Sequence, residues 1–393
     1  MNKYLCLPIS FSCCLNPSSM KLIVYLLASL LLAGFSTLPE LSFFPISNTS
    51  AMVGRVASEP KAQIDTQYTH FFTRYATWNG GDGVYSTPLP DGRIVWTFGD
   101  SFLGLVKLDR TRLPNQNVMV RNSMMIQTVE TFDGFKTLNK GANTTNAGQT
   151  YFNHAKQPGG KDWYWPLDAT VYDRKLQVLL SHVQKTGSGS WDFKNASIDI
   201  AICSASTGAI EKIIVNKYQG QWGYGGAVCE ASDGFTYIYG VIHGNLTTNV
   251  VVARAPKGDL TATWQFWNGS QWGSQPKDFS VYKDASDQFS VFRYGAKYYL
   301  FTQEIIFGRR LFLSESSRPI GPWTAKRLLY TVPPEHSTDK VFTYNALVHP
   351  ELSRNGDLMI SYCVNTTNFD DLFNIPGSAD LYRPYFIRVT NWQ

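Results

Sequence analysis

The chain has few charged residues and no cluster of them. Of its 393 residues, only 17% are Asp, Glu, Lys or Arg, and the formal net charge is +5. A nucleic-acid surface needs basic side chains gathered in a patch or stripe, and no run of like charges occurs along this sequence. The composition therefore predicts that nucleic acid is not a partner.

Short motifs for cofactors and nucleophiles are also missing. The sequence has no glycine-rich phosphate loop followed by a helix, no H-E-x-x-H, no C-x-x-C and no G-x-S-x-G. Cys203, Cys229 and Cys363 follow the N-terminal region, and their spacing suits no metal. A bridge between Cys203 and Cys229 is one alternative, but we expect all three to be small core residues. The residues alone predict no metal and no cofactor.

Long helices are absent as well. After residue 60, no apolar pattern at helical spacing is longer than two turns. Aromatic residues make up 14% of the chain, with 31 Gly and 19 Pro. This composition favours an all-β architecture with many turns.

One hairpin pattern occurs five times. In each copy a polar residue opens an apolar stretch, which is followed by a turn and a second apolar stretch. The mean period is roughly 65 residues, longer than that of the common propeller repeats, and long loops would account for the excess. The pattern predicts a five-bladed β-propeller of four-stranded antiparallel blades. The copies begin at Gly81, Leu167, Tyr224, Asp287 and Asn345.

The N-terminus carries the pattern of a targeting segment. Lys21 precedes an apolar run, residues 22–34, which is shorter than the ~20 residues of a membrane span and is followed by small residues. We expect a signal segment at 1–36 with its true start at Met20, a linker at 37–62 and the propeller at 63–393. An uncleaved anchor is the alternative. The sequence thus predicts a secreted, extracellular or periplasmic protein without stable membrane insertion after signal removal.

Polar residues open and close these hairpins at one rim. In an antiparallel hairpin, the start of the first strand and the end of the second lie side by side, so these residues share one face. Each residue alone is as readily explained as a turn former, but their coincidence on one face predicts a site. The rim residues are Asp82, Asp100, Asp168, His182, Tyr224, His243, Asp287, Gln288, Glu304, Asn345 and Asn365.

Acids and aromatic rings together predict a carbohydrate site. Rings stack on sugar faces, while carboxylates transfer protons and stabilise an oxocarbenium-like state. We assign catalysis to Asp82, Asp100 and Asp168, and we expect burial among aromatics to raise the pKa of Asp168. The nearby rings are Trp78, Trp96, Phe102, Trp163, Trp165 and Trp222. The predicted substrate-binding residues are Arg121, Asn122, Trp165, His182, Tyr224, His243, Gln288, Glu304, Asn345 and Asn365.

Several longer motifs resemble a known group of proteins. They are W-x-F-G-D-S at 96–101, R-N-S at 121–123, Y-W-P-L-D at 164–168, W-G-Y-G-G-A-V at 222–228, G-P-W at 321–323 and Y-N-A-L-V-H-P-E-L-S at 344–353. Together they resemble the secreted families of domains of unknown function numbered 4185 and 5005. Those families are similar to five-bladed propeller glycoside hydrolases, related in fold to arabinanases and invertases. Some of these relatives cleave arabinofuranose polymers.

The resemblance implies roles for individual residues. Asp82 matches the aspartate that serves as general base, and Asp168 matches the one that orients the acid. Tyr224 stands where the general-acid glutamate is expected, so the acid would come from Asp100, Asp287 or Glu304. Similar propellers can hold a calcium ion in the channel, and this is the only metal the resemblance suggests.

We therefore expect a glycoside hydrolase that acts on a polysaccharide or oligosaccharide. The alternatives are a carbohydrate-binding propeller without turnover and a structural protein with a filled channel.

Overall fold

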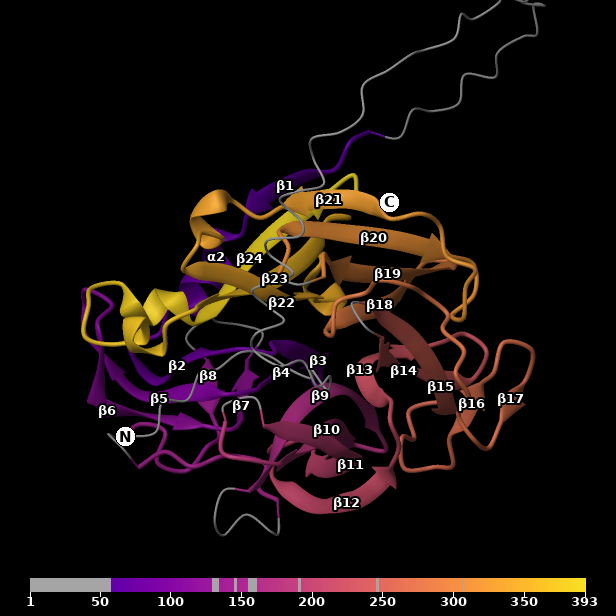
Figure 1. Ribbon diagram of the computed structural model, residues 1–393, viewed down its shortest axis with the longest axis horizontal. Coiled ribbons are helices and arrows are strands. Elements are labelled where there is room, and N and C mark those ends of the chain that lie inside the picture. Colours follow the sequence, from indigo (N-terminus) through magenta and orange to yellow (C-terminus); the bar gives the residue numbers. More distant parts are fainter. Residues whose placement is uncertain are drawn as a thin grey trace, which may run out of the picture. The chain divides into compact units, whose positions relative to one another are not determined.

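The computed structural model shows β-sheets arranged around a common centre (Figure 1). Residues Glu59–Gln393 belong to one compact unit. The predicted signal segment, its start at Met20 and linker residues 37–57 lie outside the described residues. No helix in the described part of the chain is long and apolar enough to cross a membrane. The structure describes residues 58–128, 134–144, 147–154, 161–189, 192–244, 247–305 and 307–393.

The prediction of an all-β chain is confirmed. Within the described ranges, the helical elements are α2 (Thr66–Phe71) and four short 3-10 helices. The 3-10 helices are Pro334–His336, Pro350–Leu352, Phe369–Leu372 and Ser378–Leu381. All three cysteines after residue 60 are buried and free, as expected for core residues.

All five predicted hairpins are present. They are the antiparallel pairs β3–β4, β9–β10, β13–β14, β18–β19 and β22–β23, and each pair belongs to a different sheet. Asp173 and Arg174 join β9 to β10 with φ of 47° and 60°, as a two-residue type I′ turn requires.

These five sheets contain the following strands. The first has β3 (Tyr85–Pro88), β4 (Ile94–Phe98), β7 (Ser123–Gln127) and β8 (Phe135–Thr137). The second has β9 (Asp162–Tyr172), β10 (Lys175–Lys185), β11 (Phe193–Ser204) and β12 (Ile210–Tyr218). The third has β13 (Gly223–Glu230), β14 (Phe235–His243), β15 (Thr248–Pro256), β16 (Gln265–Trp267) and β17 (Trp272–Gly273). The fourth has β18 (Phe289–Tyr294), β19 (Lys297–Gln303), β20 (Arg310–Ser316) and β21 (Arg327–Thr331). The fifth has β22 (Val341–Val348), β23 (Leu358–Thr366), β24 (Arg383–Thr390) and β1 (Lys61–Ile64).

A sixth sheet departs from the prediction. It has three strands, β2 (Ala76–Gly81), β5 (Ser101–Val106) and β6 (Arg112–Val120), and it belongs to none of the five repeats. In the described part, four of the six sheets have the expected four strands. The β13 sheet has five strands and the sheet of β2, β5 and β6 has three. The chain is therefore less regular than its repeat predicts.

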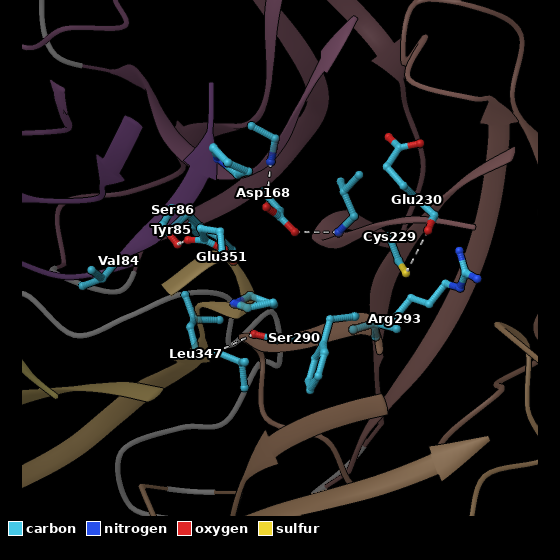
Figure 2. A pocket seen from close by; sticks show the side chains of 17 residues that line it. Val84, Tyr85, Ser86, Asp168, Cys229, Glu230, Ser290, Arg293, Leu347 and Glu351 are labelled. Atoms are coloured by element: carbon cyan, nitrogen blue, oxygen red, sulfur yellow. Dashed lines mark hydrogen bonds between the residues drawn. The ribbon is translucent and has the colours of Figure 1, made fainter. Parts of the chain in front are cut away.

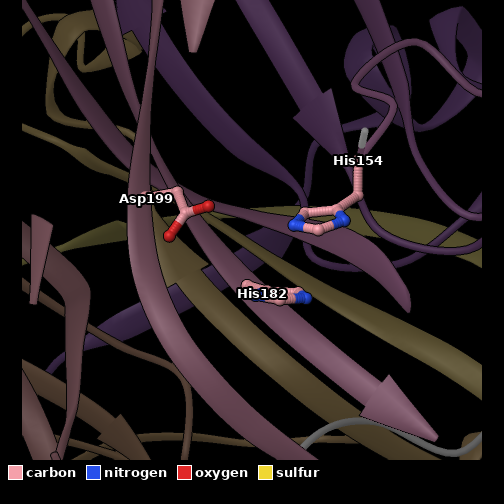
Figure 3. Close-up of side chains that lie close together, drawn as sticks. All are labelled: His154, His182 and Asp199. Carbon is pink, nitrogen blue, oxygen red and sulfur yellow. The ribbon is translucent and has the colours of Figure 1, made fainter. Parts of the chain in front are cut away.

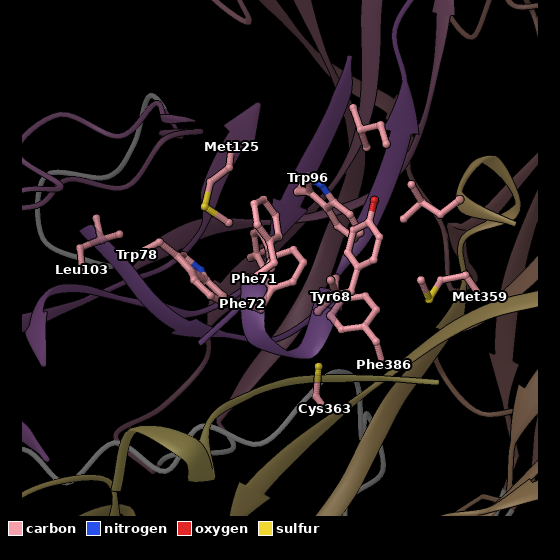
Figure 4. Close-up of a cluster of buried hydrophobic side chains, with 14 of the residues drawn as sticks. Tyr68, Phe71, Phe72, Trp78, Trp96, Leu103, Met125, Met359, Cys363 and Phe386 are labelled. Carbon is pink, nitrogen blue, oxygen red and sulfur yellow. The ribbon is translucent and has the colours of Figure 1, made fainter. Parts of the chain in front are cut away.

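The two ends of the described chain meet in one sheet and one core. Strand β1 pairs antiparallel with β24. Asp65 caps helix α2 by accepting from Tyr68 N at 2.7 Å, and its other oxygen pairs with Arg388 Nε at 2.6 Å. The helix buries Phe72 against Phe386 of β24, with the rings stacked 5.1 Å apart (Figure 4). Burying each such side chain contributes about 1.5–3 kcal/mol, so the helix ties the first and last strands together.

Candidate active site

The three-stranded sheet places two predicted acids and the predicted arginine, Arg121, at one of its edges. Gly81, Ser101 and Val120 are paired across β2, β5 and β6. Asp82 follows Gly81, Asp100 precedes Ser101 and Arg121 follows Val120, so in this antiparallel sheet the three residues extend from the same edge. Residues opposite each other in a sheet lie about 5 Å apart, so these three side chains start from neighbouring backbone positions.

Asp82 is held by two tyrosines. Its Oδ2 accepts hydrogen bonds from Tyr344 Oη at 3.0 Å and from Tyr382 Oη at 2.9 Å. The residue is 8% exposed. A Cβ on Gly99 would lie 2.5 Å from Asp82 Oδ1, so glycine at position 99 leaves this oxygen its space.

Asp100 faces nitrogen donors instead. Trp165 Nε1 donates to its Oδ1 at 3.2 Å, and Arg121 Nη1 lies 3.4 Å from its Oδ2. Tyr382 Oη is also 3.2 Å from the backbone oxygen of Asp100, so one hydroxyl contacts the Asp82 carboxyl and the main chain of Asp100. The structure thus brings together four of the predicted site residues, Asp82, Asp100, Arg121 and Trp165.

The surroundings of Asp82 raise the pKa of its carboxyl to about 7. Burial is the main cause and the charge of Asp100 adds to it, while the hydrogen bonds from Tyr382 and Tyr344 oppose the rise. Near neutral pH this carboxyl can therefore hold and release a proton. The donors around Asp100, one of them a guanidinium, are suited to a carboxylate. Two neighbouring acids in such unequal surroundings are able to serve as acid and base.

Asp168 lies in a cavity among the inner strands (Figure 2). The cavity has a volume of about 270 Å³ and is lined by residues of β3, β9, β13, β18 and β22. Asp168 accepts hydrogen bonds from Ala169 N at 2.8 Å and Val228 N at 2.6 Å. Burial raises its pKa to about 7 against these two backbone donors, in agreement with the expectation from the sequence. Val84, two residues after Asp82, lines the same cavity, whereas Asp82 and Asp100 are not among its lining residues.

A second buried acid lines this cavity. Ser86 Oγ donates to Glu351 and lies 2.6 Å from His349 Nδ1, whose Nε2 is 2.8 Å from Ser361 Oγ. Burial raises the pKa of Glu351 to about 7 and lowers the pKa of His349 to about 3. His349 is thus neutral over most of the pH range and extends a hydrogen-bonded chain away from the cavity.

Two predicted amides, Asn365 and Gln288, lie close to Asp82 or its partners, and a third follows one of those partners in the sequence. Asn365 Nδ2 donates to Tyr344 Oη at 3.2 Å and so acts on Asp82 through that tyrosine. Asn345 directly follows Tyr344 in β22. A Cβ on Gly83 would lie 3.3 Å from Gln288 Nε2, which places this amide against the residue next to Asp82.

The remaining predicted residues make other contacts. Tyr224 packs in a hydrophobic cluster with Trp264 and Phe266, and Glu304 forms an ion pair with Arg310. Asn122 donates to the backbone oxygens of Phe152 and Tyr164 inside the molecule. His243 Nε2 lies 2.5 Å from Asp287 Oδ1. None of these contacts between described residues joins them to the acid pair.

The aromatic rings near the site are not open stacking surfaces. The sequence suggested exposed rings, yet all six residues are at most 7% exposed because they pack in the hydrophobic clusters of the sheets. They are Trp78, Trp96, Phe102, Trp163, Trp165 and Trp222. Trp165 contributes its N–H to Asp100 rather than its face to solvent.

Residues 65–392 match the family described as "Domain of unknown function (DUF5005)". The chain belongs to this family. The match runs from helix α2 to the residues after β24 and agrees with the resemblance found in the motifs. No curated protein matches the chain.

Solved structures give one close neighbour and several distant ones. A protein of Bacteroides ovatus ATCC 8483, provisionally named a hydrolase, is 31% identical with a TM-score of 0.75, and the alignment covers 87% of this chain and 93% of that one. A GH43_1 enzyme from Xanthomonas citri, complexed with xylose, is 13% identical with a TM-score of 0.45, covering 81% and 92%. An exo-β-1,3-galactanase from Phanerochaete chrysosporium is 9% identical with a TM-score of 0.45, covering 79% and 60%. The last two are glycoside hydrolases too distant to support an argument about chemistry.

The DUF5005 chain also has a buried cluster of potential metal ligands (Figure 3). One ligand atom each from His154, His182 and Asp199 lie within 4.8 Å of one another. The two imidazoles are stacked, 4.0 Å apart and 16° from parallel. Lone pairs lie in the ring planes, so parallel rings cannot direct both nitrogens at one ion. Asp199 already accepts from Tyr164 Oη at 2.6 Å and Ser197 Oγ at 2.6 Å, and these residues as arranged do not fit a metal.

Sequence reasoning missed the two tyrosines on Asp82. Tyr344 precedes Asn345, and because neighbouring residues of a strand face opposite ways, the rule that selected Asn345 passed over it. Tyr382 lies 300 residues from Asp82, just after a 3-10 helix, and no local pattern marks it. Ser86 was missed because it lies inside β3, and Glu351 because it lies in the 3-10 helix after β22; neither opens nor closes a hairpin.

Proposed function

We propose that this DUF5005 protein is a secreted glycoside hydrolase acting on a polysaccharide or oligosaccharide. The observation that carries the proposal is the pair of buried acids, Asp82 and Asp100, in unequal surroundings. Hydrolysis of a glycosidic bond needs one carboxyl to protonate the leaving oxygen and another to activate water or attack the anomeric carbon.

The surroundings favour a division of roles. Asp82, with a pKa of about 7, gives the proton to the leaving oxygen, and Asp100, facing Arg121 and Trp165, is the base or nucleophile. This exchanges the roles that the resemblance to arabinanases implies for Asp82. Asp168, held by two backbone amides, influences the pair from the cavity. The separation of the acting oxygens with substrate bound sets the stereochemistry, about 5–5.5 Å for retention and about 6.5–9.5 Å for inversion.

We further propose that the five sheets with repeat hairpins are the blades of a five-bladed propeller. The sheet of β2, β5 and β6 is then an addition whose function is to place Asp82, Asp100 and Arg121 together. The 31%-identical hydrolase of known structure supports a hydrolytic role, and the motif resemblance supports an arabinofuranose-containing substrate. Export is supported by the apolar N-terminal run, residues 22–34.

The test is a screen of the purified protein against arabinans, fructans, xylans and galactans with detection of new reducing ends. We expect one polymer to be cleaved, and the isosteric variant Asp82→Asn to release no product from it while keeping its fold. Full activity in Asp82→Asn would contradict the assignment of the site.

A carbohydrate-binding protein without turnover is the second candidate. Its support is Tyr224, which is buried where the resemblance expects the general-acid glutamate. A polymer that binds tightly but yields no new reducing ends would favour this candidate.

A further inference from the structure

Two buried amides near Asp82 have polar atoms without hydrogen-bond partners in the described part of the chain. Gln288 is 2% exposed and Asn345 is 6% exposed. Gln288 Oε1, an acceptor, and Asn345 Nδ2, a donor, are both shielded from water and unpaired. Such atoms are rare in folded proteins because leaving them unpaired is costly, so each needs a physical reason.

The two amides lie on or next to neighbouring strands. Gln288 directly precedes β18 and Asn345 lies in β22, and these are neighbouring inner strands. Val348 N donates to Ser290 Oγ at 2.9 Å and so joins the two strands. Moving from that contact toward the strand starts leads to Gln288 on one strand and Asn345 on the other. Gln288 adjoins Asp82 through Gly83, and Asn345 directly follows Tyr344, whose hydroxyl donates to Asp82.

The backbone around Asn345 is built to hold this side chain in place. Asn345 has a φ of 52°, within a bulge between Tyr344 and Leu347. Gln303 forms hydrogen bonds to the backbone on both sides of Asn345. Its Nε2 donates to Thr343 O at 3.0 Å, and its Oε1 accepts from Ala346 N at 3.3 Å. A left-handed residue held in place by its surroundings is a feature that clusters at ligand sites.

We infer, resting on the proposed function, that Gln288 and Asn345 bind neutral hydroxyl groups of the sugar ring held beside Asp82 and so determine which sugars are accepted. A hydroxyl both donates and accepts, so it can pair with Gln288 Oε1 and with Asn345 Nδ2. Small side-chain rotations, which are fast, open the way to these atoms. Uncharged amides favour a neutral sugar over a uronic acid. A sugar lacking the recognised hydroxyl is rejected because the amides stay unpaired.

Binding of free sugars tests this without requiring turnover. L-Arabinose, D-xylose, D-galactose and D-galacturonic acid are titrated into the full chain by ligand-observed NMR. We expect a neutral sugar to bind, and Gln288→Leu and Asn345→Gly each to weaken it about 10- to 100-fold. Glycine keeps the positive φ, and Asn355→Gly, at a turn residue with φ of 51°, is the matched control and leaves binding unchanged. If Asn345→Gly unfolds, as seen in its thermal melt, Gln288→Leu carries the test.

Deoxy analogues of the bound sugar sharpen the result. We expect one analogue to bind the wild type about 10- to 100-fold more weakly, and that difference to vanish in Asn345→Gly or Gln288→Leu. Unchanged binding in both variants, tighter binding of galacturonic acid, or no binding of any neutral sugar to the wild type overturns the inference. The proposed function fails separately, when sugars bind in this way but no polymer is cleaved.

Discussion

Two pairs of buried acids, which we call the mouth acids (Asp82 and Asp100) and the cavity acids (Asp168 and Glu351), are held in different ways. At the mouth, Asp82 and Asp100 are surrounded by side-chain donors from several sheets. In the cavity, Asp168 is held by backbone N–H groups and Glu351 by Ser86 (Figure 2). Asp168 thus has the two backbone donors, whereas Glu351, like Asp82 and Asp100, accepts from a side chain that can follow a change of charge. The proposed function assigns proton exchange to Asp82 and Asp100, and the following predictions test whether Asp168 and Glu351 only support them.

The largest effect should come from removing the mouth acids. We expect Asp82→Asn and Asp100→Asn each to lower kcat by about 10³-fold or more on the polymer found by the screen, because each removes one proton-transfer group. Glu351→Gln is the control from the cavity and should change kcat less than about threefold. If Asp168→Asn loses as much activity as Asp82→Asn with an intact fold, the mouth and the cavity form one catalytic site and the comparison fails.

The pH dependence of the free energy of unfolding should reveal the raised pKa of Asp82. Its pKa is about 7 in the folded chain and near 3.8 when unfolded, so the folded state loses stability as pH rises from about 4 to about 7. The whole rise corresponds to at most about 4 kcal/mol. Asp82→Asn cannot ionise, so we expect it to be more stable than the wild type at pH 8 and similar to it at pH 4.

Urea unfolding at both pH values measures this difference. Asp91→Asn, at an exposed turn where Arg93 lowers the pKa of Asp91, is a suitable control because its stability difference should have the opposite sign and be small. An Asp82→Asn variant that is less stable than the wild type at pH 8 would show that folding does not raise the pKa of Asp82.

The five hairpins could be predicted because each is local. A turn such as Asn355-Gly356 between two apolar stretches defines both strands and their register. The sixth sheet could not, because β2 contains Asn79, Gly80 and Gly81 and finds its partner β5 beyond an entire hairpin. The choice of polar residues that open and close the hairpins still found Asp82 and Asp100, and Arg121 was predicted as a substrate-binding residue, since each of the three lies at a strand end. It could not foresee that the tryptophans nearby would be buried, because burial depends on packing between sheets.

A smaller effect should follow from changing a donor at the mouth. Tyr382→Phe removes a hydrogen bond that lowers the pKa of Asp82, so that pKa should rise above 7. If Asp82 is the acid, activity should extend to higher pH while the maximal kcat falls about tenfold. Tyr385→Phe, whose hydroxyl contacts the backbone oxygen of Asp380, should leave the pH profile of kcat unchanged. Loss of activity on the acidic side instead would make Asp82 the base.

The smallest effect is expected in the cavity. Ser86→Ala leaves Glu351 without its hydroxyl donor and His349 Nδ1 without its partner, which should lower the free energy of unfolding by about 1–2 kcal/mol. Turnover should stay within about twofold of the wild type, and the exposed Ser206→Ala should change neither quantity. Because Ser86 lies in β3 only four residues from Asp82, a large fall in kcat without loss of stability would show that the hydrogen-bonded chain through His349 reaches the acid pair. In that case the cavity takes part in proton transfer, and the two pairs of acids do not differ in function.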